Sequence, residues 1–252
     1  MRVFTAYFDG SGSPDDTVAI VVAGFVAPAE QWIEFKRNWN DCLRDFGVSS
    51  LHMRNFAHSR GEFATWKGNE DRRRGFLGRL ISIIRVRVWH SFACAVVMED
   101  YRSVDGKFCL SEFSKPYALA GCTCLTKVER WKERFCKSED EVAVVFEDGD
   151  KDKGDLIRAA RSFSVSPSFL TKQGTVAFQA ADLLAYEHLL TNVKIQKSET
   201  GSIFEDELRR PFMELSAIPG GHGDWGIHME DDLTSSCIKD GVPLRVPNPH
   251  LG

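Results

Sequence analysis

The chain lacks the features of several protein classes. No apolar run approaches the ~20 residues that a membrane helix needs, and charges such as Asp9 come too early for a signal peptide. It contains no internal repeat and no low-complexity segment. A net charge of −4 argues against unspecific coating of nucleic acid, although a local basic groove is compatible with it. These absences favour a folded cytoplasmic protein with no membrane segment.

The cysteines lack any pattern of a metal knuckle or a redox pair. There are seven, an odd number, and none of their spacings is Cys-x-x-Cys. Such scattered cysteines are typical of reduced thiols in a cytoplasmic protein. With 252 residues, of which 43% are hydrophobic, the chain is long enough to bury a sizeable core.

What the chain does have is a series of apolar runs and helical stripes. The runs predict five strands, and the first two are joined by so short a glycine- and proline-containing turn that we expect an antiparallel hairpin. Strands are predicted at residues 3–9, 18–26, 86–98, 142–146 and 167–171. Helices are predicted at residues 29–46, 70–84, 115–135, 155–163 and 176–191.

The order of these elements predicts an α/β fold. Without the helical insertion at about 29–84, the order is β-β-β-α-β-α-β-α, which is that of the ribonuclease H-like fold. We therefore expect a mixed five-stranded sheet with helices on both faces, in a domain spanning residues 1–194. Residues 195–252 are expected to form an extension packed on the same domain. The first and fourth strands should then be parallel neighbours.

Three acidic residues stand at apolar positions far apart in the sequence. Asp9 and Glu147 each end a predicted buried strand, and Asp182 lies within a predicted buried helix. A carboxylate beside a core is costly unless a cation or hydrogen-bond donors compensate it. The carboxyl ends of parallel strands meet at one sheet edge, so these acids are candidate catalytic residues and metal ligands. An all-oxygen set favours Mg²⁺ or Mn²⁺ over zinc.

The helix around Asp182 supports this hypothesis. Gln179, Asp182 and Tyr186 share one helix face. A lone helical aspartate more often forms a salt bridge than binds metal. No Lys or Arg occurs between Gln173 and Lys194, which weakens that alternative.

Further ligands and substrate contacts are expected near the same edge. Asp148 is a candidate metal ligand, and Lys151 and Lys153 are candidate phosphate contacts near a helix N-terminus. An acidic solvated turn is the alternative interpretation of the loop around Glu147. Ser11, His52 and Gln179 are further candidate substrate-binding residues, with a turn role for Ser11 and a structural role for His52 as alternatives.

Four segments of the chain form a set of motifs: Tyr7-Phe8-Asp9-Gly10-Ser11-Gly12, Leu51-His52-Met53 with Phe56, Phe146-Glu147-Asp148-Gly149-Asp150, and Gln179-Ala180-Ala181-Asp182-Leu183-Leu184-Ala185-Tyr186. Together they resemble the domain-of-unknown-function 3800 family of bacterial and phage proteins, which is thought to be ribonuclease H-like. The resemblance implies a metal-dependent, nuclease-like site. The first motif departs from the family's Asp-Glu-Ser-Gly pattern, because Gly10 replaces the glutamate and removes one candidate ligand.

Together these observations predict a hydrolase of phosphodiesters in RNA or DNA. A metal-activated water would be the nucleophile, with Asp9, Glu147 and Asp182 as ligands. The alternative is a non-catalytic module that binds nucleic acid or protein and retains a degenerate site, which Gly10 and the negative net charge favour. RNA, DNA and hybrid substrates, endo- and exonucleolytic cleavage and the oligomeric state all stay open.

Overall fold

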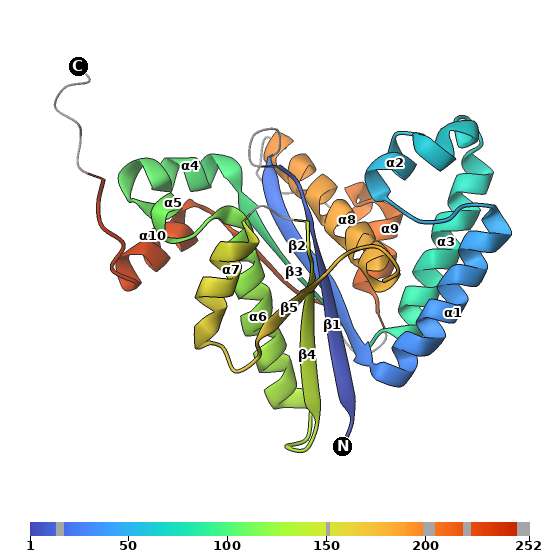
Figure 1. The fold of residues 1–252 in the computed structure, drawn as a ribbon. Coiled ribbons are helices and arrows are strands. Elements are labelled where there is room, and N and C mark those ends of the chain that lie inside the picture. The colour runs from blue at the N-terminus through green and yellow to red at the C-terminus, as the bar shows by residue number, and fades with distance from the viewer. Residues whose placement is uncertain (14–17, 150–151, 199–204, 219–222, 246–252) are drawn as a thin grey trace.

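The predicted strands lie together in one mixed sheet (Figure 1). The computed structural model describes residues 1–13, 18–149, 152–198, 205–218 and 223–245. Within these residues the strand order is β5-β4-β1-β2-β3-β6. The strands are β1 (Val3–Ser11), β2 (Ala19–Pro28), β3 (His90–Val97), β4 (Glu141–Glu147), β5 (Pro167–Leu170) and β6 (Asp224–His228).

The pairing of the strands confirms the expected topology around the sheet centre. β1, β2 and β3 form an antiparallel meander. β4 then pairs with β1 in parallel, with Phe8 opposite Phe146, and β5 pairs in parallel with β4. Because Asp9 and Glu147 each follow one of these two phenylalanines, the register brings both acids to the same sheet edge.

Within the described residues the sheet has six strands, so the prediction of five is wrong. The sixth strand, β6, lies in the segment after residue 194 and pairs in parallel with β3. Its five residues are only partly buried or exposed, so no apolar run marks it in the sequence. The same segment also adds Leu215 to one core and Leu233 to the other.

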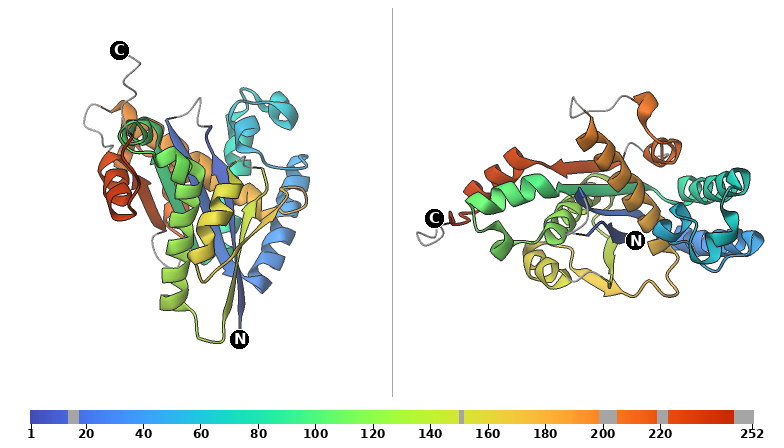
Figure 2. Two further views of the ribbon diagram at one scale, coloured as in Figure 1. Left: turned by 60° about the vertical axis from the view of Figure 1, so that its left-hand side comes forward. Right: turned by 90° about the horizontal axis from the view of Figure 1, so that it is seen from above.

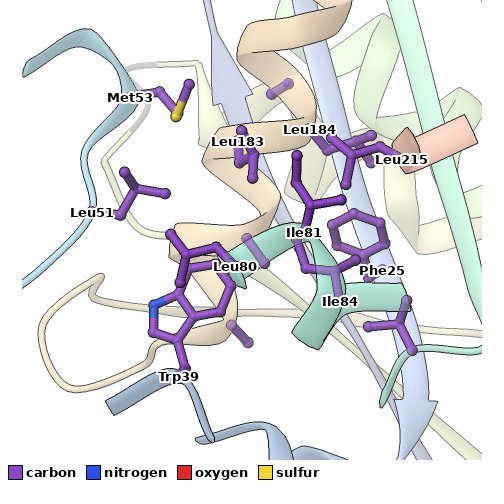
Figure 3. Packing of buried hydrophobic residues seen from close by; sticks show 14 of the residues in the cluster. Phe25, Trp39, Leu51, Met53, Leu80, Ile81, Ile84, Leu183, Leu184 and Leu215 are labelled. Atoms are coloured by element: carbon purple, nitrogen blue, oxygen red, sulfur yellow. The ribbon is translucent and has the colours of Figure 1, made fainter. Parts of the chain in front are cut away.

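One face of the sheet is covered by the helices between β2 and β3 together with two later helices (Figure 2). In Figure 3, Leu183 and Leu184 lie beside Ile81 and Ile84, which shows how two of these helices share one core. Through these helices, this layer lies next to the sheet edge at which Asp9 and Glu147 are found. It contains α1 (Ala29–Phe46), α2 (Met53–Ala57), the 3₁₀ helix η1 (Gly61–Trp66), α3 (Glu70–Arg87), α8 (Ala177–Lys197) and α9 (Arg210–Ser216).

The opposite face carries the remaining helices and a second core. Phe8 and Phe146 point into it from neighbouring strands, and their rings stack at 5.0 Å. Within the described residues, none of the helices has the length and apolarity to cross a membrane. The helices of this layer are α4 (Met98–Lys107), α5 (Leu110–Phe113), α6 (Pro116–Phe135), α7 (Lys153–Ala159) and α10 (Glu230–Lys239). Short 3₁₀ helices occur at η2 (Ala160–Ser162) and η3 (Glu205–Glu207).

Helix α8 is tied to the inserted helices by one buried side chain. The Gln179 carbonyl oxygen accepts hydrogen bonds from Trp39 Nε1 of α1 at 2.9 Å and from the Leu51 amide at 2.8 Å. Both donors are buried away from water, so each needs a hydrogen-bond acceptor within the protein. The Gln179 oxygen is that acceptor for both. Gln179, predicted to contact substrate, therefore has a structural role as an acceptor.

Replacing Gln179 by leucine should lower the free energy of unfolding by roughly 2–5 kcal/mol, because two buried N–H groups lose their acceptor. Urea unfolding followed by circular dichroism would measure the change. Gln173→Leu is the matched control, since Gln173 is exposed, and we expect it to change stability by under about 0.5 kcal/mol. Equal effects of the two substitutions would contradict the structural role of Gln179.

Candidate active site

The three predicted acids line one cleft of about 560 Å³. Asp9 belongs to β1, Glu147 is the last residue of β4, and Asp182 lies on α8, which packs against β1 and β2. Ser11 lines the same cleft. Asp9 thus lies in one cleft with two acids that are more than a hundred positions away in the sequence, at the carboxyl end of the two central parallel strands, where open α/β sheets commonly bind ligands.

Asp9 is almost completely buried and has two partners. Its Oδ1 accepts a hydrogen bond from the Gly10 amide at 2.8 Å, and its Oδ2 accepts one from Lys172 Nζ at 2.5 Å. Burial raises the pKa of Asp9 to about 6, against an opposing effect of Lys172 and with a further increase from Asp182. This carboxyl group therefore binds a proton more readily than an ordinary aspartate.

Asp182 is similarly buried and also has two hydrogen-bond partners, which differ from those of Asp9. Its Oδ2 is hydrogen-bonded to His52 Nδ1 at 3.0 Å and to the Met53 amide at 2.9 Å. Burial alone would raise the pKa of Asp182, but these hydrogen bonds and the charge of Lys172 lower it below its ordinary value. His52 thus orients Asp182, and its half-exposed side chain also faces the cleft.

Lys172 is the site residue that the sequence analysis missed. It lies in the loop between β5 and α8, and its Nζ is 2.5 Å from Asp9 Oδ2 and 3.6 Å from Asp182 Oδ2. Burial alone would lower the pKa of Lys172, but the charges of Asp182 and Asp9 raise it. Lys172 directly precedes Gln173, so it lies just outside the stretch from Gln173 to Lys194 within which no Lys or Arg occurs. The signal was the position of Lys172 directly after a predicted strand at the same sheet edge.

Glu147 stands at the side of this group. Its side chain is partly buried, and its carboxylate lies so close over Gly149 that a Cβ added there would collide with it. A glycine at position 149 therefore leaves room for the carboxylate to fold back along the loop. In this position Glu147 adds a third negative charge to the cleft beside Asp9 and Asp182.

Three of the other predicted residues do not line the cleft with the acids. Asp148 and Lys153 form an ion pair with each other outside it. Gln179 lines a neighbouring pocket. Lys151 lies outside the described residues. The loop after β4 is therefore a partly self-neutralised turn, and the roles of Asp148 in metal binding and of Lys153 in phosphate binding stay predictions.

The carboxylates of the cleft differ in how well they fit a divalent cation. In the described parts of the chain, no group of three or more His, Cys, Asp or Glu side chains is close enough to hold a metal ion. Two carboxylates nevertheless converge on one cation, the Lys172 ammonium. Asp9 and Asp182 are therefore arranged to share a positive charge, and their hard oxygen donors suit Mg²⁺ or Mn²⁺.

Comparisons with known proteins give only distant likenesses. No protein-family model and no curated protein matches the chain. Bst-RNase HIII in complex with Mn²⁺ is similar over 84% of this chain and 64% of its own, with 14% identity and a TM-score of 0.45. This chain thus spans less than two thirds of that protein. A chain of the PCNA:RNase HII complex from Archaeoglobus fulgidus is similar over 98% of both chains, with 13% identity and a TM-score of 0.42. These TM-scores are too low for either likeness to support an assignment.

The raised pKa of Asp9 predicts a pH-dependent stability in chelator-containing buffer. Because the pKa in the folded protein, about 6, exceeds the ordinary value of 3.8, the contribution of Asp9 is fully present below about pH 4. It is lost as the pH rises through about 6, by up to roughly 3 kcal/mol. Urea unfolding of wild type and Asp9→Asn between about pH 4 and 7 measures it as a changing difference. A difference that is constant with pH would contradict the assignment.

Proposed function

We propose that this chain is a ribonuclease H-like, metal-dependent phosphodiester hydrolase, related to the domain-of-unknown-function 3800 family that its motifs resemble. The observation that carries the proposal is the convergence of Asp9 and Asp182 on a single cation at the edge where β1 and β4 end. The order β5-β4-β1-β2-β3 supports the fold assignment, because it combines an antiparallel meander with parallel strands. The substrate class, RNA or DNA, is part of the proposal.

Asp9, Asp182 and Glu147 would hold Mg²⁺ or Mn²⁺. When bound, such an ion activates a water molecule and stabilises negative charge on a phosphodiester. The chain's own part is to hold the carboxylates in place: the Gly10 amide holds Asp9, and His52 with the Met53 amide holds Asp182. The Lys172 ammonium would have to move out from between Asp9 and Asp182. It would then lie near a phosphate bound in the cleft.

The rim of the cleft offers positive charge for the substrate. Arg54 and His58 line it from the segment around α2, and both are exposed. Within the described residues, neither has an ion-pair partner. A phosphate group entering the cleft would thus meet the Arg54 guanidinium at the rim before the buried acids. This offsets the repulsion between the acids and an anionic substrate.

A second candidate function is a non-catalytic binding module with a degenerate site. The observation in its favour is Lys172, which already neutralises the two acids that would bind metal. Gly10, in place of an acid, agrees with it. The two candidates differ in whether the wild-type protein binds a divalent ion and cleaves nucleic acid.

Incubation with labelled RNA, DNA and hybrid strands, with and without Mn²⁺, tests the first candidate. We expect cleavage that requires the ion, and a rate at least about a hundredfold lower in Asp9→Asn and Asp182→Asn, since several kcal/mol of charge stabilisation are lost. Asp148→Asn is the matched control, because Asp148 directly follows Glu147 in the chain but does not line the cleft. Cleavage that survives both EDTA and Asp9→Asn would sink the proposal. Absence of ion binding and of cleavage would favour the binding module.

Removing the internal cation should strengthen metal binding. In Lys172→Met the ammonium no longer competes for Asp9 and Asp182, and this competition is on the order of 1 kcal/mol or more. Calorimetry should therefore show Mn²⁺ binding about tenfold tighter than in wild type. Lys153→Met removes an equal charge whose partner is Asp148, and we expect unchanged affinity. Weaker Mn²⁺ binding in Lys172→Met would show that the lysine does not compete with the ion.

A further inference from the structure

A second pocket of about 670 Å³ lies beside the cleft with the three acids. His52 and Lys172 line both cavities, so the two are neighbours with a common border at these residues. The second pocket extends from there between α1 and the loop after β5, over Gln173 and towards Lys36. Its size lies within the roughly 300–1,000 Å³ of typical ligand sites. A strand bound at the acids would therefore have a neighbouring pocket within reach, next to the inserted helices.

The walls of the second pocket are held in fixed positions. Trp39 of α1 donates to Gln179 of α8, and Trp32 Nε1 donates to the Thr5 carbonyl at 2.8 Å. These two indoles fasten α1 to α8 and to β1. Lys36 and Asn40 are one helical turn apart on α1, so they share a face and line the pocket together.

The chemistry of this pocket is opposite to that of the acidic cleft. No Asp or Glu side chain lines it in the part of the chain that the structure describes. Lys36, Asn40 and Gln173 are exposed, and the described residues provide no hydrogen-bond or ion-pair partner for their side chains. A lysine charge and two free amide groups, without a competing carboxylate, suit a bound anion.

We propose that this second pocket binds a backbone phosphate of the nucleic-acid strand, next to the phosphodiester held at the acids. Lys36 supplies the charge, and the Asn40 and Gln173 amides donate hydrogen bonds. The inference rests on the proposed function. The pocket borders the cleft in which a nucleic-acid strand is proposed to bind, and for this reason the strand is its proposed ligand. Contacts of this kind position a strand and carry no base specificity.

Binding of a fluorescein-labelled single-stranded oligonucleotide tests the proposal, with Ca²⁺ present and fluorescence anisotropy as the readout. For Lys36→Glu we expect about tenfold weaker binding, and a slope of log affinity against log salt that is smaller by about 1. Asn40→Ala should weaken binding less. Lys239→Glu is the matched control, because Lys239 is an exposed lysine on α10, which packs on the opposite face of the sheet. The affinity of this variant for the oligonucleotide should stay within about twofold of wild type.

The outcomes separate this inference from the proposed function. If wild type cleaves strands and Lys36→Glu binds them as tightly as wild type does, the inference is overturned and the function stands. If only Lys36→Glu binds more weakly and neither wild type nor any variant cleaves, the phosphate-binding role of the pocket is supported and the proposed hydrolase activity is overturned. Wild type that fails to bind the oligonucleotide overturns the inference. Inorganic phosphate that competes with an affinity equal to that of the strand would show a free-phosphate site, and would overturn the assignment to a strand.

Discussion

The close packing of α8 against β1 and β2 is the interaction on which the candidate site depends. Ala180, Ala181 and Ala185 are completely buried, and such small side chains let a helix approach a sheet closely. This packing presents Asp182 to the edge where β1 ends, and it presents Gln179 to the inserted helices. One helix therefore sets both the distance between the acids and the position of the wall beside them.

The close grouping of charge at this edge explains why each acid has its own set of partners. Asp9 and Asp182 are both buried, and two like charges at short range oppose each other's ionisation. Lys172 lies between them, and His52 supports only Asp182, so the two carboxyl groups differ in proton affinity although they share a cation.

Apolar patterning was sufficient to predict the sheet centre and the meeting of three distant acids. Asp9 and Glu147 could be placed because each ends an apolar run, and parallel pairing then follows from the element order. Lys172 also follows a predicted strand at this edge, but its contacts with Asp9 and Asp182 depend on the path of the loop after the four-residue strand β5, which apolar patterning does not give. The role of Gln179 was equally hidden, since its partners lie 140 and 128 positions away.

The late position of β6 in the chain has a consequence for folding during synthesis. Strands β1 to β5 and helix α8 are complete by Lys197, whereas β6 begins at Asp224. The acidic edge can therefore assemble on the ribosome while β3 is still an unpaired border of the sheet. An unpaired border of this kind is a template for pairing with other chains. In the described structure β6 pairs with β3 and so covers this border, at the side of the sheet away from the acids.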